Sequence, residues 1–194
     1  MRVAAFAAAI FACLAAAAQT PASRPPAGEL DPAIQAEVEQ LRSWAQHAAI
    51  VGAVRDQNAL NVPLSRIRSI DISWMSATQD NSRVQVLLKN PCAKALQGFT
   101  ARRPGYREAF VMDNQGALVG TTRKTSDYWQ GDEDKWRMSF AEGRGAVYAS
   151  EPQLDDSAGV RLIHVSVPVM DGGKAIGVLT AGIEADLLQR RGVR

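Results

Sequence analysis

The chain has 194 residues, of which 46% are hydrophobic and 22% are charged, and its formal net charge is +2. These values are ordinary for a globular protein and fit one domain with short accessory segments. A charge so close to balance gives no electrostatic reason to expect nucleic acid, whose binding needs clustered Lys and Arg, so no nucleic acid partner is expected. The densest basic cluster, Arg102, Arg103 and Arg107, flanks a Pro-Gly turn and is expected to form a solvated rim.

An export signal is predicted at the N-terminus. Arg2 precedes an almost unbroken apolar run over residues 3–18, and Ala16–Ala18 fit the small-residue pattern of a cleavage site. The run is shorter than the roughly 20 residues that a membrane span needs. We therefore expect a cleaved signal peptide over residues 1–18, a periplasmic or secreted location, and no transmembrane segment in the mature chain. The alternatives are an uncleaved anchor and a lipoprotein attached through Cys13.

The folded domain is expected over residues 31–190. Residues 19–30 are rich in Pro, Ala and Ser, which predicts a linker. Asp31 and Pro32 then suit the start of a helix of about 25 residues. Its apolar side chains recur at steps of four and three, at Ile34, Val38, Leu41, Ala45, Ala48 and Gly52. One such stripe needs a partner surface, and its small residues favour packing against a sheet.

The next segment, residues 60–88, has a broken helical pattern that Pro63 interrupts. Asn90 and Pro91 then predict the start of another helix, from Cys92 to about Arg102. Cys92 is the only cysteine left after signal cleavage. We expect it to be a small buried hydrophobic residue, with an intermolecular disulfide as the alternative.

From Arg107 the apolar period changes from 3.6 towards 2, which predicts strands. Five antiparallel strands are expected at 108–112, 117–122, 145–149, 160–169 and 174–183, with a helix at 133–141 between the second and third. Residues 171–173 predict a tight hairpin turn. The predicted class is α+β, with the long N-terminal helix packed on a five-stranded antiparallel sheet.

The fourth predicted strand has two unlike faces. Ile163, Val165, Val167 and Val169 make one face apolar, whereas Leu162, His164, Ser166 and Pro168 make the other face mixed. The apolar face suits the long helix. The mixed face can hold a small ligand under a loop, which makes His164 a candidate contact.

The densest set of side chains suited to binding lies in residues 121–136. The rings of Tyr128 and Trp129 can wall a pocket or bind a cation, with Asp127 or Asp132 as the counter-charge. Arg123 or Lys124 can bind a carboxylate instead. A structural reading stays open, in which Asp132 caps the next helix and residues 136 and 140 form a core pair of that helix.

Several motifs in this order resemble the Cache, or PDC sensor, domain. They are Asn90–Ala93, Phe110–Gly116, Lys124–Glu133, Val165–Val169, Asp171–Gly173 and Ile176–Val178. The resemblance covers roughly residues 31–190, and the run from Asp127 to Glu133 is its most specific part. It implies a PAS-like antiparallel sheet with a pocket for a small metabolite such as an amino acid, an amine or a carboxylate.

By position, the resemblance puts Tyr128, Trp129, Gln130 and Asp132 on the pocket loop. It puts Asp186 where many members keep an acidic ligand contact. The sequence departs from the usual pattern because no transmembrane helix and no signalling module follow the domain. A stand-alone domain of this kind is expected to relay ligand occupancy to another protein, such as a membrane-bound signalling protein.

No enzymatic activity, cofactor or metal site is expected. His164 and Ser166 share a strand face, but no orienting carboxylate is apparent nearby in the sequence. The cysteines and histidines lack zinc-site spacing, and no glycine loop has the phosphate-binding pattern. The alternative function is a periplasmic interaction or structural module without a small-molecule ligand.

Overall fold

The computed structural model describes residues 30–155 and 159–192. The predicted signal peptide over residues 1–18, Cys13, and the linker up to residue 29 lie outside the described residues. The elements in chain order are α1 (Pro32–Ala45), α2 (Ala48–Ala59), α3 (Leu64–Met75), α4 (Ser82–Lys89), α5 (Pro91–Thr100), β1 (Tyr106–Met112), β2 (Leu118–Thr121), α6 (Asp134–Phe140), a 3-10 turn (Ala141–Gly143), β3 (Tyr148–Ala149), β4 (Gln153–Asp155), β5 (Val160–Asp171), β6 (Lys174–Glu184) and α7 (Ala185–Gly192).

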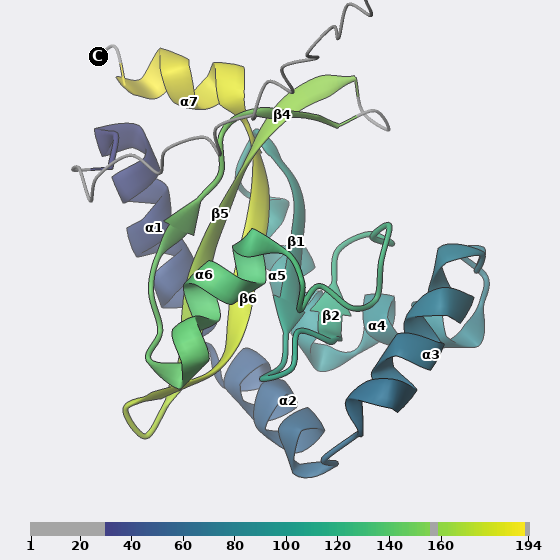
Figure 1. The fold of residues 1–194 in the computed structure, drawn as a ribbon. Coiled ribbons are helices and arrows are strands. Elements are labelled where there is room, and N and C mark those ends of the chain that lie inside the picture. Colours follow the sequence, from purple (N-terminus) through teal and green to yellow (C-terminus); the bar gives the residue numbers. More distant parts are fainter. Residues whose placement is uncertain (1–29, 156–158, 193–194) are drawn as a thin grey trace, which may run out of the picture.

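The fold is α+β, as predicted, and is built on one antiparallel sheet (Figure 1). The strand order is β2-β1-β6-β5-β3, and every pairing is antiparallel. The hairpin between β5 and β6 turns at Gly172 and Gly173, whose φ values of +55° and +81° fit a type I′ turn. A sixth strand, β4, pairs with β5 and was not predicted, because it has only three residues and is largely exposed.

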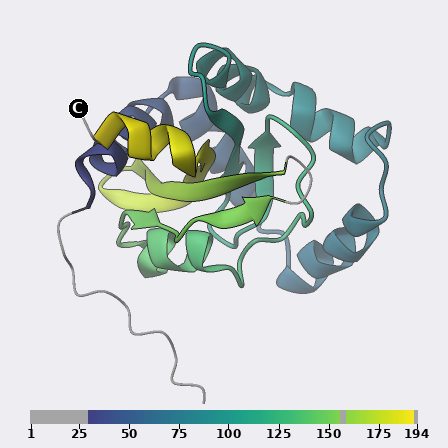
Figure 2. The same cartoon turned by 90° about the horizontal axis from the view of Figure 1, so that it is seen from above.

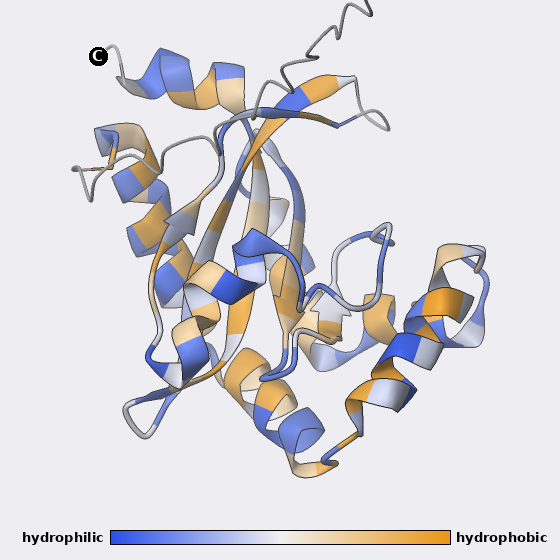
Figure 3. Cartoon of the chain, in the orientation of Figure 1, coloured by the Kyte–Doolittle hydropathy of each residue, from blue (hydrophilic) through white to orange (hydrophobic). Residues whose placement is uncertain are grey.

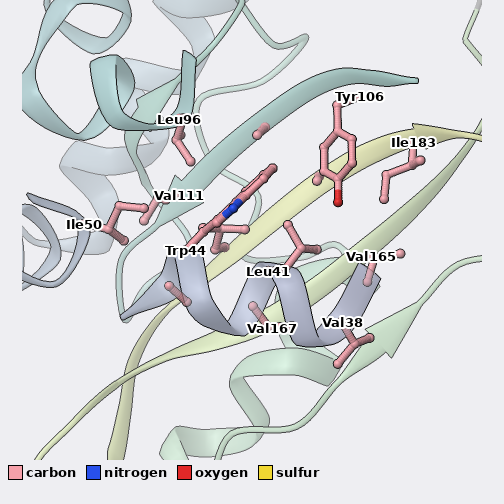
Figure 4. Packing of buried hydrophobic residues seen from close by; sticks show 14 of the residues in the cluster. Val38, Leu41, Trp44, Ile50, Leu96, Tyr106, Val111, Val165, Val167 and Ile183 are labelled. Carbon is pink, nitrogen blue, oxygen red and sulfur yellow. The ribbon is translucent and has the colours of Figure 1, made fainter. Parts of the chain in front are cut away.

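Helices cover both faces of the sheet. α1, α2 and α5 lie on one side and α6 lies on the other, as the view from above shows (Figure 2). The main core forms between the sheet and the first group of helices, where Leu41, Trp44 and Val165 are buried (Figure 4). The ring of Trp44 stacks on Phe99 at 5.0 Å and lies 5.1 Å from the ring of Tyr106. The predicted packing of the apolar stripe on the sheet is therefore confirmed for its α1 part, at Val38, Leu41 and Ala45, but not for Ala48, which is exposed.

The prediction of one long N-terminal helix is wrong, because the helix breaks after Ala45. Gln46 ends α1, and His47 has the extended backbone of an N-cap. The imidazole Nδ1 of His47 accepts a hydrogen bond from the backbone N–H of Ala49 at 3.3 Å. Histidine is an uncommon cap, so the uninterrupted apolar stripe concealed the break.

A second core cluster lies where α3 and α4 meet the edge strand β2 and its neighbour β1. It buries Trp74, Phe110 and Tyr128, and the indole N–H of Trp74 donates to the carbonyl of Thr125 at 2.9 Å. This cluster fixes the start of the loop that follows β2. None of the helices in the described ranges has the length and apolar character to cross a bilayer.

The basic cluster is not a simple solvated rim. Arg103 lies 3.4 Å from a carboxylate oxygen of Glu37, and Arg107 forms an ion pair with Glu184. Only Arg102 of the three is exposed without an ion pair among the described residues. The prediction failed because both carboxylates are distant from the arginines in sequence. Glu37 lies on α1 and Glu184 lies at the end of β6.

Cys92 is buried at the start of α5, as expected. Burial raises the pKa of its thiol to about 12, so the reactive thiolate is scarce at pH 8. We expect iodoacetamide to leave Cys92 unmodified in the native protein and to alkylate it fully in 6 M guanidinium chloride, a strong denaturing condition. Mass spectrometry of the peptide that contains Cys92 measures both states, and rapid native alkylation would contradict the buried position.

Candidate functional site

The two faces of β5 differ as predicted. Ile163 and Val165 belong to the main core, whereas Leu162 and His164 face the side covered by α6. On that second side, the structure has a hollow between the sheet, the loop after β2 and the start of α6. The loop and the start of α6 are mainly hydrophilic (Figure 3).

The hollow, here called the sheet hollow, has two lobes that share Lys135, Gln153 and His164. The large lobe has a volume of about 440 Å³, and the small lobe of about 220 Å³. The large lobe is lined by Glu108, Arg123, Lys124, Thr125, Ser126, Lys135, Gln153, Leu154, Asp155, Leu162 and His164. The small lobe is lined by Glu133, Asp134, Lys135, Tyr148, Ser150, Gln153 and His164. A volume of this size suits a small metabolite, and the lining is mostly polar.

The floor of the large lobe depends on a glycine in the central strand. Gly182 of β6 pairs with Glu108 of β1 on one side and with His164 of β5 on the other. Because Gly182 has no side chain, the Glu108 carboxylate and the His164 imidazole meet above it, with Oε1 and Nε2 3.0 Å apart. A Cβ at position 182 would lie 2.9 Å from Cγ of Glu108, which is closer than van der Waals contact.

This contact corrects one point of the sequence analysis, which found no carboxylate near His164. Glu108 is that carboxylate, and both side chains are 15% exposed. Ser166 does not join them, since its hydroxyl is hydrogen-bonded to that of Thr180 at 2.8 Å. The floor is therefore a carboxylate–imidazole pair beside a separate hydroxyl pair.

Cationic side chains gather around the large lobe. Arg123 lies 3.4 Å from Asp155, and Lys135 lies 2.6 Å from Glu133. The ammonium of Lys124 contacts the carbonyl of Thr125 at 3.4 Å and lies over the ring of Trp74. The carboxylates of Glu108 and Asp155 line the same lobe, so a ligand can find both cationic donors and anionic acceptors there.

The small lobe is lined by two carboxylates and one cation, Lys135. Glu133 and Asp134 line it together with the phenol of Tyr148 and the hydroxyl of Ser150. Burial raises the pKa of Tyr148, and the negative charges of Asp134, Glu133 and Glu151 raise it further. These carboxylates therefore favour the protonated form of the phenol.

The aromatic pair proposed as ligand contacts lies outside the lining of the sheet hollow. Tyr128 is buried beside Trp74, with ring centroids 5.8 Å apart, and burial followed by the charge of Asp113 raises its pKa to about 12. The indole N–H of Trp129 donates to the carbonyl of Gln115 at 2.8 Å. Gln130 is buried, and its Nε2 donates to the carbonyl of Asp127 at 3.0 Å. These contacts stabilise the loop from within.

The three predicted acidic contacts also lie away from the lining. The carboxylate of Asp127 accepts from the hydroxyl of Ser126 at 2.7 Å. Asp132 is exposed and is not the cap of α6, since Glu133 has that position. Asp186 is exposed in the first turn of α7. Of the predicted site residues, the structure therefore brings only Arg123, its alternative Lys124, and His164 together at the sheet hollow.

Among the charged lining residues, Glu108 and Lys135 were not predicted as contacts, whereas Lys124 was predicted, as the alternative to Arg123, to bind a carboxylate. Glu108 alternates with Phe110 along β1, so the period of the strand places both on the mixed face of the sheet. That signal was present in the sequence. The position of Lys135 depends on where the loop after β2 places the start of α6, which no period predicts.

Asp71 of α3 anchors the aromatic loop. One of its carboxylate oxygens accepts from the backbone N–H groups of Tyr128 and Trp129, at 2.8 and 3.0 Å. We expect Asp71→Ala to lower the free energy of unfolding by about 2 kcal/mol, because two backbone donors lose a charged acceptor. Urea denaturation measures the change. Asp71→Asn keeps an acceptor oxygen and should cost less than half as much, and equal costs for both variants would contradict this anchoring role.

Within the described ranges, no three His, Cys, Asp or Glu side chains are grouped so that they could hold a metal ion.

Comparisons with known proteins identify similar domains. Residues 76–190 match the family model described as methyl-accepting chemotaxis protein-like, first PDC sensor domain. No curated protein is significantly similar in sequence. Among solved structures, the ligand-binding domain of the Campylobacter jejuni chemoreceptor Tlp3 in complex with 4-methylisoleucine has 15% identity and a TM-score of 0.42, covering 81% of this chain and 61% of that chain.

Two further solved structures are similar to the same degree. The sensory domain of Tlp3 with isoleucine bound has 15% identity and a TM-score of 0.41, covering 86% of this chain and 69% of that one. The ligand-binding domain of the Pseudomonas aeruginosa amino acid chemoreceptor PctC in complex with GABA has 14% identity and a TM-score of 0.41, covering 80% and 65%. The chain thus spans about three fifths of the length of the first structure.

Proposed function

Because the chain belongs to the family of methyl-accepting chemotaxis protein-like first PDC sensor domains, we propose that it binds a small polar metabolite in the sheet hollow. The proposed role is that of a sensor-type, non-catalytic domain that works outside the cytoplasmic membrane. Ligand occupancy would be relayed to another protein, such as a membrane-bound signalling protein.

The observation that carries this proposal is the sheet hollow itself. It lies on the mixed face of the sheet, over the floor formed by Glu108 and His164. Its lining offers cations for a carboxylate and carboxylates for an amine, which fits an amino acid, an amine or a carboxylate as ligand. Arg123 and His164 keep the roles predicted for them, and Lys135 joins them because it lines both lobes.

A thermal-shift screen tests the proposal. The purified protein is mixed with amino acids, amines and carboxylates, including isoleucine, valine and GABA. A ligand at a hundred times its dissociation constant should stabilise the native state by about 2.7 kcal/mol. No shift with any compound would favour an interaction module without a small-molecule ligand.

Variants then locate the site. We expect Lys135→Ala to weaken the binding of an active compound by about tenfold or more, because it removes a charged contact of both lobes. Lys94→Ala is the matched control, since Lys94 is exposed on α5, which packs on the other face of the sheet. Isothermal titration calorimetry measures both, and an affinity unchanged in Lys135→Ala would move the site away from the sheet hollow.

A further inference from the structure

Exposed apolar side chains are concentrated on and around α3. Seven large hydrophobic side chains of the described residues are exposed, and five of them lie between the end of α2 and α4, namely Leu60, Leu64, Ile72, Met75 and Val86. Three of these recur at steps of eight and three along α3 and therefore share one side of that helix. The opposite side of α3 packs on the second core cluster. Both α3 and α4 lie at one edge of the molecule (Figures 1 and 2).

Exposed cations accompany these apolar side chains. On α3 and α4 they are Arg66, Arg68, Arg83 and Lys89. In the part of the chain that the structure describes, none of the four forms an ion pair with a carboxylate, and the guanidinium of Arg68 lies over the ring of Trp129 at 4.8 Å. The four cations are therefore available to an anionic partner.

Carboxylates are scarce on the same helices. Residues 60–89 contain only two, Asp71 and Asp80. One oxygen of Asp71 accepts from the backbone N–H groups of the aromatic loop, so only Asp80 is an exposed carboxylate of this segment.

This segment accounts for the whole net charge of the chain. Residues 60–89 contain 4 basic and 2 acidic side chains, whereas the chain contains 22 and 20, so 18 of each sign remain elsewhere. The exposed side chains of α3 and α4 thus form one basic, partly apolar surface, here called the α3–α4 surface. Its apolar members are Leu64, Ile72, Met75 and Val86, and its cations are the four described above.

A second copy of the chain does not suit the α3–α4 surface. In a two-fold dimer the same surface faces itself, so the cations of one copy would meet those of the other. Only Asp80 of each copy offers an exposed carboxylate to offset this repulsion. The charge of the surface therefore favours an anionic partner.

The side chains also favour a bilayer over a protein partner. Protein interfaces are commonly held by aromatic side chains that fill packed pockets. The only aromatic residue of α3 and α4 is Trp74, which is buried and whose indole N–H donates to the carbonyl of Thr125. The exposed apolar side chains are aliphatic or thioether groups beside long cationic side chains. This combination is typical of helices that lie at a membrane interface.

From these observations we infer that the α3–α4 surface binds the surface of an anionic phospholipid bilayer. Ile72 and Met75 enter the boundary between headgroups and acyl chains, and the cations contact lipid phosphates at the ends of their flexible stems. The inference goes beyond the proposed function, because the α3–α4 surface contains no residue that lines the sheet hollow.

Co-sedimentation with vesicles tests the inference on the full chain. Vesicles of phosphatidylcholine alone are compared with vesicles that contain equal amounts of phosphatidylcholine and phosphatidylglycerol. We expect binding to be at least about tenfold tighter on the anionic vesicles. This difference should disappear at about 1 M salt, where the Debye length is about 3 Å. Equal binding to both kinds of vesicle at low salt would overturn the inference.

Variants locate the binding surface, and every variant retains the apolar run over residues 3–18, which can itself enter a bilayer. Arg66→Gln combined with Arg68→Gln should weaken binding to anionic vesicles by about tenfold or more, because each cation near such a surface contributes roughly fivefold. Ile72→Ser should weaken it by at least about fivefold. Arg102→Gln combined with Lys174→Gln is the matched control, since it removes two exposed cations elsewhere on the protein. A control variant that weakens binding as much as the α3 pair would overturn the inference.

Sedimentation velocity without vesicles tests the competing occupants. The wild-type chain and Ile72→Ser should sediment as the same species. A dimer that Ile72→Ser dissociates would overturn the inference and assign the α3–α4 surface to a second copy. Failure of the wild-type chain to bind either kind of vesicle would overturn it as well and leave the surface to a protein partner. The thermal-shift screen decides the proposed function separately, because it contains no lipid.

Discussion

Replacing Gly182 by valine is expected to lower the affinity of the sheet hollow for its ligand by more than about 100-fold. The valine side chain would occupy the space in which Glu108 and His164 meet, since even a Cβ at this position would lie 2.9 Å from Glu108 and 3.2 Å from Leu162. The two floor residues must then separate or rise into the large lobe. Extra atoms in a packed site also cost about 1–3 kcal/mol of stability.

Calorimetric titration of the compound that stabilises the protein most measures this effect. Gly182→Ala, a smaller step, should give an intermediate loss of affinity. Gly98→Ala is the matched control, because the added methyl group has no heavy atom within 4 Å there. If Gly182→Val folds and keeps the wild-type affinity, the ligand does not bind over this floor.

Replacing Glu37 by alanine is expected to lower the free energy of unfolding by about 3 kcal/mol, because it breaks a buried network. The Glu37 side chain is only 3% exposed, on α1. One of its oxygens accepts from the hydroxyl of Tyr106 and lies 3.4 Å from Arg103, and the other accepts from Arg191 of α7. The variant leaves the buried Tyr106 hydroxyl without its acceptor, whereas the two partly exposed arginines can still reach water.

Urea denaturation of Glu37→Ala measures this cost. Glu39→Ala is the control on the same helix, because Glu39 is exposed and its pair with Arg42 at 3.7 Å contributes little. Equal stabilities for the two variants would show that the network does not join α1 to β1 and α7.

Local signals in the sequence predicted much of the fold. The cap at Asn90 is confirmed, since its side chain accepts from the backbone N–H of Ala93 at 2.8 Å. The glycine turn at 172–173 and the two faces of β5 are confirmed as well. Each of these features depends on neighbouring residues, so the pattern of the chain alone is sufficient to predict it.

Features that depend on distant residues were missed. The last helix, α7, has a short amphipathic sequence that follows β6 without a turn signal. The Glu37 network joins residues from α1, the start of β1 and α7, which no local pattern relates. Contacts between residues so far apart in sequence can be predicted only when the arrangement of the helices and the register of the strands are known.

In the candidate site, too, features set by neighbouring residues were predicted and features set by distant residues were not. His164 was predicted from the mixed face of its strand, and the structure places it in the lining. Tyr128 and Trp129 were expected at the ligand because of their chemistry, but chemistry does not say which way a ring points. Their backbone amides bind Asp71, and the ring of Tyr128 packs against Trp74. The meeting of Glu108 and His164 over Gly182 required the register of three strands.

The central claim is that a small ligand binds over the floor formed by Glu108, Gly182 and His164. An NMR titration of the ¹⁵N-labelled protein with the most stabilising compound of the thermal-shift screen tests it most directly. We predict that the largest amide shift changes occur at these three residues and in the loop at 123–126. Saturable binding with shift changes confined to α3, α4 or the surroundings of Asp186 would contradict the claim.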